Sequence, residues 1–154
     1  MQQQFLIKNL VDLKKIAYLI ANSIKPNSYF LFFGKIGVGK TQLIKFVFEI
    51  LQIKKIIFSP SFIILHQIKA KNLIFNHFDF YRLDQFRNND QELNLYVEYM
   101  IDNVNFIEWP KIIETKILKI NYNLKVKIYL DFNSSNPEFR NCKIIWEEKH
   151  ESIF

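Results

Sequence analysis

Eight consecutive residues have the types and the spacing of a phosphate-binding loop. The segment Gly34-Lys35-Ile36-Gly37-Val38-Gly39-Lys40-Thr41 fits G-x-x-x-x-G-K-[ST] at every fixed position. Phosphate oxygens need several backbone N–H groups that point into one concavity, and glycine allows the positive φ angles and close backbone approach this requires. The lysine of such a loop reaches the β- and γ-phosphates, and the hydroxyl binds Mg²⁺. We therefore expect ATP and Mg²⁺ to bind at Gly37, Val38, Gly39, Lys40, Thr41 and the adjoining Gln42, with Lys40 also active in catalysis.

The residues around the loop favour a phosphate site over a chance match on a surface turn. An apolar run over residues 29–33 ends directly before the motif and predicts a buried strand. All three glycines of the chain lie inside the motif. We expect Lys40 to sit in an exposed loop, so that its removal severely weakens nucleotide binding and leaves the fold intact. The apolar residues that follow fit one face of a helix from about Lys40, whose positive N-terminal end would point at phosphate: Leu43, Ile44, Phe46 and Val47.

Two acidic residues follow later apolar runs. Asp79 comes after the predicted strand 73–78, and Glu108 after the predicted strand 104–107. The carboxyl ends of parallel strands meet at one edge of a sheet, so both acids are expected beside the phosphate loop. There we expect Asp79 and Glu108 to bind Mg²⁺ together with Thr41 and to act in hydrolysis. The alternative for either acid alone is that it caps a turn.

The order of elements predicts one α/β domain over residues 1–154, with a P-loop NTPase fold. Its sheet should be mostly parallel and flanked by helices, with antiparallel strands at the C-terminal end. Predicted helices cover residues 10–23, a stretch from about 40, and the region of 93–100, with Asn9 as a cap for the first. Further strands are expected at 56–58, 62–65, 73–78, 104–107, 124–131 and 143–146, the last two forming a hairpin.

Composition limits the classes of protein that the chain can represent. Its 154 residues are 49% hydrophobic and 23% charged, as in an ordinary globular protein. The net charge of +6 is spread over the chain, so it is compatible with an RNA-bearing partner without identifying one. Cys142 is the only cysteine, which excludes an internal disulfide and a thiolate zinc cluster. No apolar run approaches the length of about 20 residues that spans a bilayer, so we expect a cytoplasmic protein without membrane contact.

Six short motifs in a fixed order resemble the TsaE (YjeE) family of bacterial ATPases, which supports threonylcarbamoyl modification of adenosine in tRNA. The family has G-x-L-G-A-G-K-T, S-P-T-[FY], H-F-D-L-Y-R-L, E-L, E-Y and E-W-P. The resemblance spans most of the chain, roughly 9–140. The matching segments are Gly34 to Thr41, Ser59-Pro60-Ser61-Phe62, His77-Phe78-Asp79-Phe80-Tyr81-Arg82-Leu83, Glu92-Leu93, Glu98-Tyr99 and Glu108-Trp109-Pro110.

The resemblance implies roles beyond those that the residues alone suggest. Ser59 to Phe62 would form a nucleotide-sensitive loop, and Arg140 would contact the nucleotide, although a surface arginine is a nearly equal alternative. The partners would be proteins of the TsaB and TsaD type, with tRNA engaged only indirectly through that complex. Ser61 in place of threonine, Gln42 in place of a second threonine and the missing glycine before Glu98-Tyr99 put the switch behaviour in more doubt than nucleotide binding.

Three further side chains have more than one interpretation each. His77 could be a catalytic base, but a histidine that alternates with apolar residues on a strand is more often structural, and we favour that role. Trp109 is either part of the functional motif or an aromatic residue packed beside the site. Arg82 could reach a phosphate, but it could equally pair with an acid or pack over Tyr81.

Three functions share the same loop. The first is a weak, Mg-dependent and partner-dependent ATPase, which we prefer. The second is a small-molecule or nucleoside kinase, which passes the phosphoryl group to a bound acceptor. Against it stand the few arginines, Arg82, Arg87 and Arg140, and the expectation that little of the chain remains for a separate acceptor pocket. The third is a nucleotide-binding structural subunit that barely hydrolyses ATP.

Overall fold

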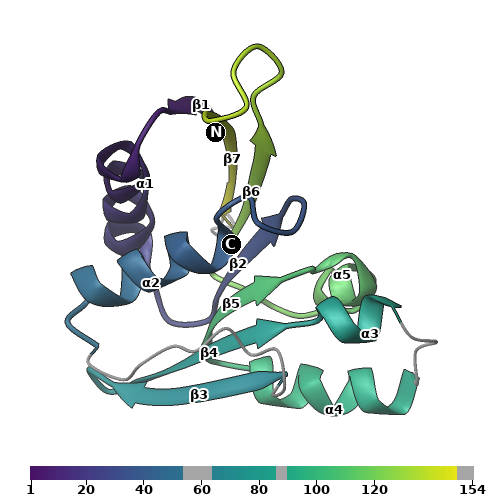
Figure 1. The fold of residues 1–154 in the computed structure, drawn as a ribbon. Helices are drawn as coiled ribbons and strands as arrows, with labels where there is room; N and C mark the ends of the chain where they lie inside the picture. Colours follow the sequence, from purple (N-terminus) through teal and green to yellow (C-terminus); the bar gives the residue numbers. More distant parts are fainter. Residues whose placement is uncertain (54–63, 86–89, 149–154) are drawn as a thin grey trace.

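The computed structural model describes residues 1–53, 64–85 and 90–148, and these form one seven-stranded sheet with helices on both faces (Figure 1). Asn9 caps the first helix, accepting hydrogen bonds from the N–H groups of Val11 and Asp12 at 2.9 and 3.0 Å. The elements in order are β1 Gln2–Ile7, α1 Leu10–Ser23, β2 Ser28–Phe33, α2 Lys40–Ile50, β3 Leu65–Ala70, β4 Leu73–Asp79, α3 Tyr81–Gln85, α4 Asp90–Met100, β5 Val104–Glu108, α5 Lys111–Ile117, β6 Leu124–Phe132 and β7 Arg140–Glu148.

The sheet has a parallel centre and antiparallel edges. Its order is β1-β7-β6-β2-β5-β4-β3. Strand β2 pairs in parallel with β5 and β6, and β5 with β4, whereas β7 pairs antiparallel with both β6 and β1, and β3 pairs antiparallel with β4. The predicted α/β fold with a parallel sheet core, flanking helices and a C-terminal hairpin is therefore confirmed.

Strand β2 separates two hydrophobic cores. Every residue of this strand is buried. Phe30 and Phe32 point into the core beneath α1 and α2, while Tyr29, Leu31 and Phe33 point into the core beneath α4 and α5. Successive side chains of a strand face opposite sides of the sheet, so a continuously apolar strand has to be covered twice. The phosphate loop begins at the end of this strand, so packing on both faces of β2 holds the start of the loop in place.

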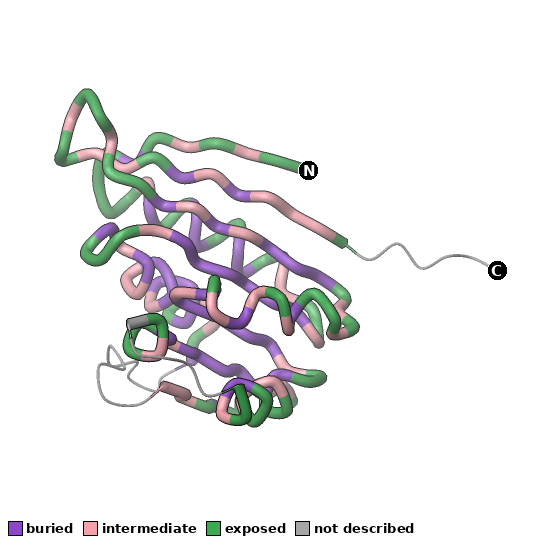
Figure 2. Tube along the Cα trace, turned by 90° about the vertical axis from the view of Figure 1, so that its right-hand side faces the viewer, coloured by how far each residue is buried: buried purple, intermediate pink, exposed green. Residues whose placement is uncertain are grey.

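Several elements were missed or displaced in the sequence-based prediction. Strand β1 was not predicted, because its glutamines give no apolar alternation; it forms by pairing with β7, from Gln2 with Ile145 to Ile7 with Arg140. Figure 2 shows that this edge strand is largely exposed, while buried residues concentrate in the central strands. The short helices α3 and α5 were also missed. The predicted strand 56–58 lies outside the described residues, as do 62 and 63, and the observed strand begins only at Leu65.

No helix within the described parts of the chain is long and apolar enough to cross a membrane.

Candidate functional site: a phosphate loop beside two strand-end acids

The phosphate loop connects the end of β2 to the start of α2 through three glycines with positive φ. Gly34, Gly37 and Gly39 have φ angles of 145°, 75° and 110°, a region that L side chains rarely occupy. Gly34 also lies directly against β6, because a Cβ built there would overlap the carbonyl oxygen of Leu130. Gly39 precedes α2 as its N-cap and makes no side-chain cap, so the first N–H groups of the helix face the site.

Lys40 reaches back over the loop rather than into solvent. Its Nζ donates hydrogen bonds to the carbonyl oxygens of Gly34 and Lys35, at 2.8 and 2.9 Å, and lies 4.3 Å from the ring centre of Trp109. The side chain is only 4% exposed, so the expectation that Lys40 sits in an exposed loop was wrong. Burial lowers the pKa of the Lys40 ammonium from its ordinary value, and the nearby carboxylates of Glu108 and Asp79 oppose this effect.

Thr41 and Glu108 meet across the sheet edge. The Thr41 hydroxyl lies 2.8 Å from Oε1 and 2.9 Å from Oε2 of Glu108, and donates its single proton to this carboxylate. Glu108 is the last residue of β5 and is only 2% exposed. A threonine hydroxyl whose proton is given to an acid presents its lone pairs on the other side, which suits a hard cation.

Asp79 ends β4 directly opposite Glu108 in the strand register. Its Oδ1 accepts a hydrogen bond from the backbone N–H of Tyr81 at 3.0 Å, so the carboxylate also caps the turn into α3. Burial raises the pKa of the Asp79 carboxyl above its ordinary value; the Tyr81 N–H works against that rise, and Glu108 adds to it. The turn-capping alternative thus describes one oxygen of Asp79, and its part in metal binding stays a prediction.

His77 contacts the same acid from the neighbouring strand. Its Nε2 lies 2.9 Å from Oε1 of Glu108, and the histidine is fully buried. Our sequence-based preference for a structural role gave no partner for this ring. A signal was present, however: His77 and Asp79 are two residues apart on β4, so both side chains face the side of the sheet where Glu108 lies.

Lys40, Thr41, Asp79 and Glu108 line a cavity of about 510 Å³, and His77 lies behind Glu108 outside this lining. Of the residues predicted to bind nucleotide or metal, Gly37, Gly39, Lys40, Thr41, Gln42, Asp79 and Glu108 line it. Sequence reasoning did not single out Lys45, one helical turn beyond Thr41, which also lines the cavity. Arg82 lines it too, as a contact between Arg82 and phosphate would require.

Two predicted contacts lie elsewhere. Val38 is buried beneath the loop, with its backbone N–H directed at the carbonyl of Lys35, 3.4 Å away. Arg140 lies at the β6–β7 hairpin, where its Nη1 donates to the carbonyl oxygens of Pro137 and Phe139 at 2.7 and 2.8 Å. It is not among the residues that line the cavity, and its contact with nucleotide stays a prediction. The segment Ser59 to Phe62 lies outside the described residues.

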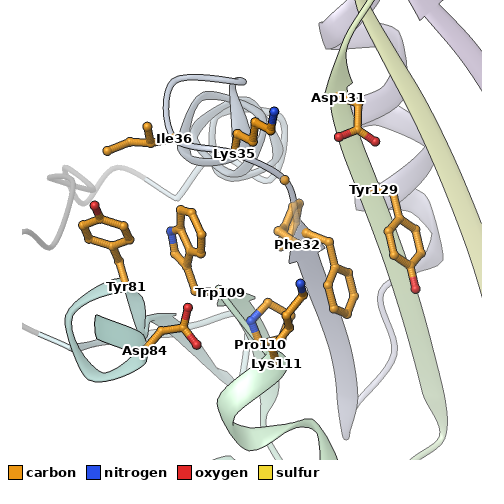
Figure 3. A pocket seen from close by; sticks show the side chains of 12 residues that line it. Phe32, Lys35, Ile36, Tyr81, Asp84, Trp109, Pro110, Lys111, Tyr129 and Asp131 are labelled. Carbon is orange, nitrogen blue, oxygen red and sulfur yellow. The ribbon is translucent and has the colours of Figure 1, made fainter. Parts of the chain in front are cut away.

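A second cavity of about 620 Å³ adjoins the first. Ile36, Tyr81 and Trp109 line both cavities, and the rings of Tyr81 and Trp109 are 4.9 Å apart. Figure 3 shows Tyr81 and Trp109 on one side of this second cavity and Tyr129 and Asp131 of β6 on the other. Trp109 therefore belongs to the wall of the site, whichever of its two interpretations holds.

The donor set fits a metal that arrives together with a nucleotide. Among the described residues, no group of three or more His, Cys, Asp or Glu side chains could hold a metal ion. The cavity instead offers the Thr41 hydroxyl and the carboxylates of Asp79 and Glu108, all oxygen donors. Proteins commonly bind Mg²⁺ in this way, through one or two carboxylates and the phosphates of a substrate.

Known proteins match this chain over nearly its whole length. The family model described as "Threonylcarbamoyl adenosine biosynthesis protein TsaE" matches residues 7–138. The chain belongs to the TsaE family. A curated relative, tRNA threonylcarbamoyladenosine biosynthesis protein TsaE of Rickettsia felis, is 32% identical over 152 residues, covering 96% of this chain and 82% of the relative. The protein of the same name from Bacillus subtilis is 29% identical over 119 residues, or 77% and 73% of the two chains.

A solved structure supports the fold assignment for this TsaE-family chain. The crystal structure of Bacillus subtilis YdiB superposes with a TM-score of 0.71 and 23% sequence identity, covering 97% of this chain and 87% of that one. At this identity the likeness concerns the fold alone.

Proposed function

We propose that this TsaE-family chain binds ATP with Mg²⁺ and hydrolyses it slowly, as an accessory protein for threonylcarbamoyl modification of adenosine in tRNA. The observation that carries the proposal is the meeting of Lys40, Thr41 and Glu108 in one cavity at the end of parallel strands. Family membership supplies the pathway. The partners that we propose are proteins of the TsaB and TsaD type, with tRNA engaged through their complex.

The site residues divide the work of phosphate binding. The loop backbone and the first turn of α2 offer N–H groups to the phosphate oxygens, and the Lys40 ammonium offsets their charge. Mg²⁺, when bound, draws charge from the β- and γ-phosphates and so stabilises the transition state. Thr41 and Glu108 would hold it, directly or through water. Asp79 lies opposite Glu108 and is placed to orient the attacking water.

The small number of cations that line the cavity supports slow turnover by the isolated chain. Arginine fingers, supplied in cis or by a partner, raise hydrolysis by about 10³ to 10⁵ in related chemistry. Besides Lys40, the described residues that line the cavity include two cations, Lys45 and Arg82, and Arg82 already interacts with another part of the chain. We therefore expect a partner to supply or order the missing group, so that binding depends on the nucleotide state.

One observation keeps the kinase alternative open. Sequence analysis left little room for an acceptor pocket, yet a cavity of about 620 Å³ adjoins the phosphate cavity and shares three residues with it. Its volume falls within the usual range for small-molecule sites, about 300 to 1,000 Å³. An acceptor bound there would lie beyond Trp109, on the Ile36 side of the loop.

A turnover experiment separates the two functions. ATP hydrolysis by the purified chain is measured alone, with the TsaB and TsaD proteins of the same organism, and with a panel of nucleosides and small alcohols. Threonylcarbamoylation of tRNA is scored in the same reactions, with Lys40→Ala as the negative control. We expect modification to require the chain, ATP and both partners. Fast phosphorylation of a small acceptor, unaffected by the partner proteins, would replace this proposal by the kinase.

A further inference from the structure

We propose that His77 is a positioning residue that fixes the carboxylate of Glu108 in the orientation that serves Mg²⁺. This inference rests on the proposed function, because it concerns the same metal-assisted site. It differs from the structural role that the sequence favoured for His77. It also predicts effects on metal dependence that a merely structural histidine would not have.

The contact is short and fully enclosed. Nε2 of His77 and Oε1 of Glu108 are 2.9 Å apart, and the two side chains are 0% and 3% exposed. Both residues lie on neighbouring central strands, β4 and β5, whose parallel register pairs His77 with Phe106 and Asp79 with Glu108. The sheet ladder therefore fixes the backbone on both sides of this hydrogen bond. A hydrogen bond to a carboxylate in such a dry environment is stronger and more directional than one in water.

The carboxylate of Glu108 has lone pairs to spare for one more partner. A carboxylate offers about four acceptor positions on its two oxygens. The Thr41 hydroxyl approaches both oxygens, at 2.8 and 2.9 Å, and the imidazole approaches Oε1 only. Oε2 is thus the oxygen left with free capacity. With Oε1 held between His77 and Thr41, the carboxylate cannot rotate about its terminal bond, and Oε2 keeps a fixed direction toward the cavity.

The hydrogen bonding of the imidazole itself supports this assignment. Because a carboxylate only accepts, Nε2 carries the proton of this hydrogen bond. Nδ1 is buried and has no hydrogen-bond partner among the described residues. A histidine retained for packing alone would gain by pairing both nitrogens or by being an apolar residue. Here the single polar contact of the ring is the one to Glu108.

Two substitutions test the idea against a matched control. His77→Leu removes the donor and keeps a side chain of intermediate size, whereas His77→Gln places an amide N–H in reach of Glu108. His66→Leu makes the same chemical change on β3, directly opposite His77 in the strand register. Loss of groups that orient metal ligands lowers metal affinity or activity about 10- to 100-fold. We expect His77→Leu to raise the Mg²⁺ concentration for half-maximal ATP hydrolysis about tenfold.

The remaining readouts separate positioning from folding. ATP affinity measured in EDTA should change less than about twofold in His77→Leu, since the loop amides are untouched. In His77→Gln the Mg²⁺ concentration for half-maximal hydrolysis should return close to the wild-type value. His66→Leu should match the wild type in both Mg²⁺ requirement and ATP affinity. Wild-type Mg²⁺ dependence in folded His77→Leu would overturn the inference and leave the ATPase proposal standing. The positioning role would also be overturned if His77→Leu and His77→Gln raised the Mg²⁺ requirement equally and lowered Tm by the same amount.

A spectroscopic measurement needs no turnover at all. In the nucleotide-free protein with ¹⁵N-labelled histidine, long-range ¹H–¹⁵N spectra report which ring nitrogen carries the proton. We expect His77 to carry it on Nε2, and Glu108→Gln to shift the His77 resonances while those of His66 move less. An unprotonated Nε2 of His77, with the proton on Nδ1 alone, would overturn the contact. Should the wild-type chain neither bind nor hydrolyse ATP, the proposed function fails by itself, and this spectrum still decides the contact.

Discussion

The two halves of the sheet differ in what lies at their strand ends. Strands β2, β4 and β5 run in parallel and end at the phosphate loop, Asp79 and Glu108. Strands β1, β7 and β6 form an antiparallel ribbon at the other edge, and no predicted catalytic or metal-binding residue lies on it. Parallel strands bring several chain segments to one edge in the same direction, so polar residues there converge. Antiparallel strands send every second end to the opposite edge.

Buried polar groups follow the same division. Within residues 1–53, 64–85 and 90–148, six of the seven buried polar or charged residues lie on β2, the loop, β4 or β5: Ser28, Lys40, Asn76, His77, Asn105 and Glu108. The seventh, Lys125 on β6, is paired with Glu147 at 2.7 Å. Buried charges are costly unless they are paired, and they concentrate where function requires them. Most of the buried polar groups thus lie in the parallel half, and they include the predicted site residues Lys40 and Glu108.

Gly34 joins the two halves, and its replacement should have the largest effect. In Gly34→Ala the new methyl group would overlap the Leu130 carbonyl of β6 and lie 2.9 Å from a methyl of Val38. We expect a loss of about 3 kcal/mol in the free energy of unfolding, measured by urea denaturation, together with loss of ATP binding. Gly37→Ala is the matched control, because nothing lies within 4 Å of its Cβ. That variant should lose only about 1 to 2 kcal/mol, from positive φ. Equal losses would contradict the close approach at Gly34.

Lys40→Ala should have the next largest effect, confined to the parallel half. It removes a buried ammonium group that lines the cavity and that we expect to contact phosphate, and charge-assisted hydrogen bonds contribute about 1.5 to 3 kcal/mol each. We expect ATP affinity, measured by calorimetry, to fall about 100-fold. Lys35→Ala deletes the same charge from an exposed position of the loop and should cost less than about threefold, since exposed charges contribute little. Similar losses in both variants would mean that only net charge matters.

The two strand-end acids should differ from each other. Glu108→Gln weakens the contacts with Thr41 and His77, whereas Asp79→Asn leaves an oxygen to accept from Tyr81. We expect Mg-dependent hydrolysis to fall about 100-fold in Glu108→Gln and about tenfold in Asp79→Asn. ATP affinity in EDTA should stay within about threefold in both, because the amide cradle is intact. Normal hydrolysis in both variants would mean that the two acids only cap turns and take no part in hydrolysis.

The smallest effect on ATP affinity is expected from a substitution in the antiparallel ribbon of β1, β7 and β6. Cys142 of β7 is buried, and burial raises the pKa of its thiol to about 12. Only the thiolate is an effective nucleophile, so iodoacetamide at pH 8 should leave the native chain unmodified until denaturant is added. Raising the pH should speed the reaction, because the thiolate fraction grows as the pH approaches the pKa. Cys142→Ala should leave ATP affinity unchanged. Rapid native alkylation would contradict the burial of the thiol, and lost ATP binding in Cys142→Ala would mean that the ribbon is coupled to the site.

The sequence alone determined the features that depend on neighbouring residues. The phosphate loop is specified by eight consecutive residues and by the apolar segments on either side of it. The strands that place Asp79 and Glu108 were also readable, because each acid directly follows an apolar run. Alternation along 124–131 predicted the strand that pairs with 143–146. Local spacing is enough in these cases, since strand and helix periodicity are local properties.

Only the tertiary structure decided how distant segments meet. The Thr41 hydroxyl and the Glu108 carboxylate are 67 positions apart in sequence, and His77 and Glu108 are 31 apart. Strand β1 forms only because β7 returns from the far end of the chain to pair with it. The burial of Lys40 and the cavity beside Trp109 likewise depend on where β5 and β6 lie relative to the loop. Such contacts are absent from local sequence patterns because they arise from packing, which joins residues according to the path of the whole chain.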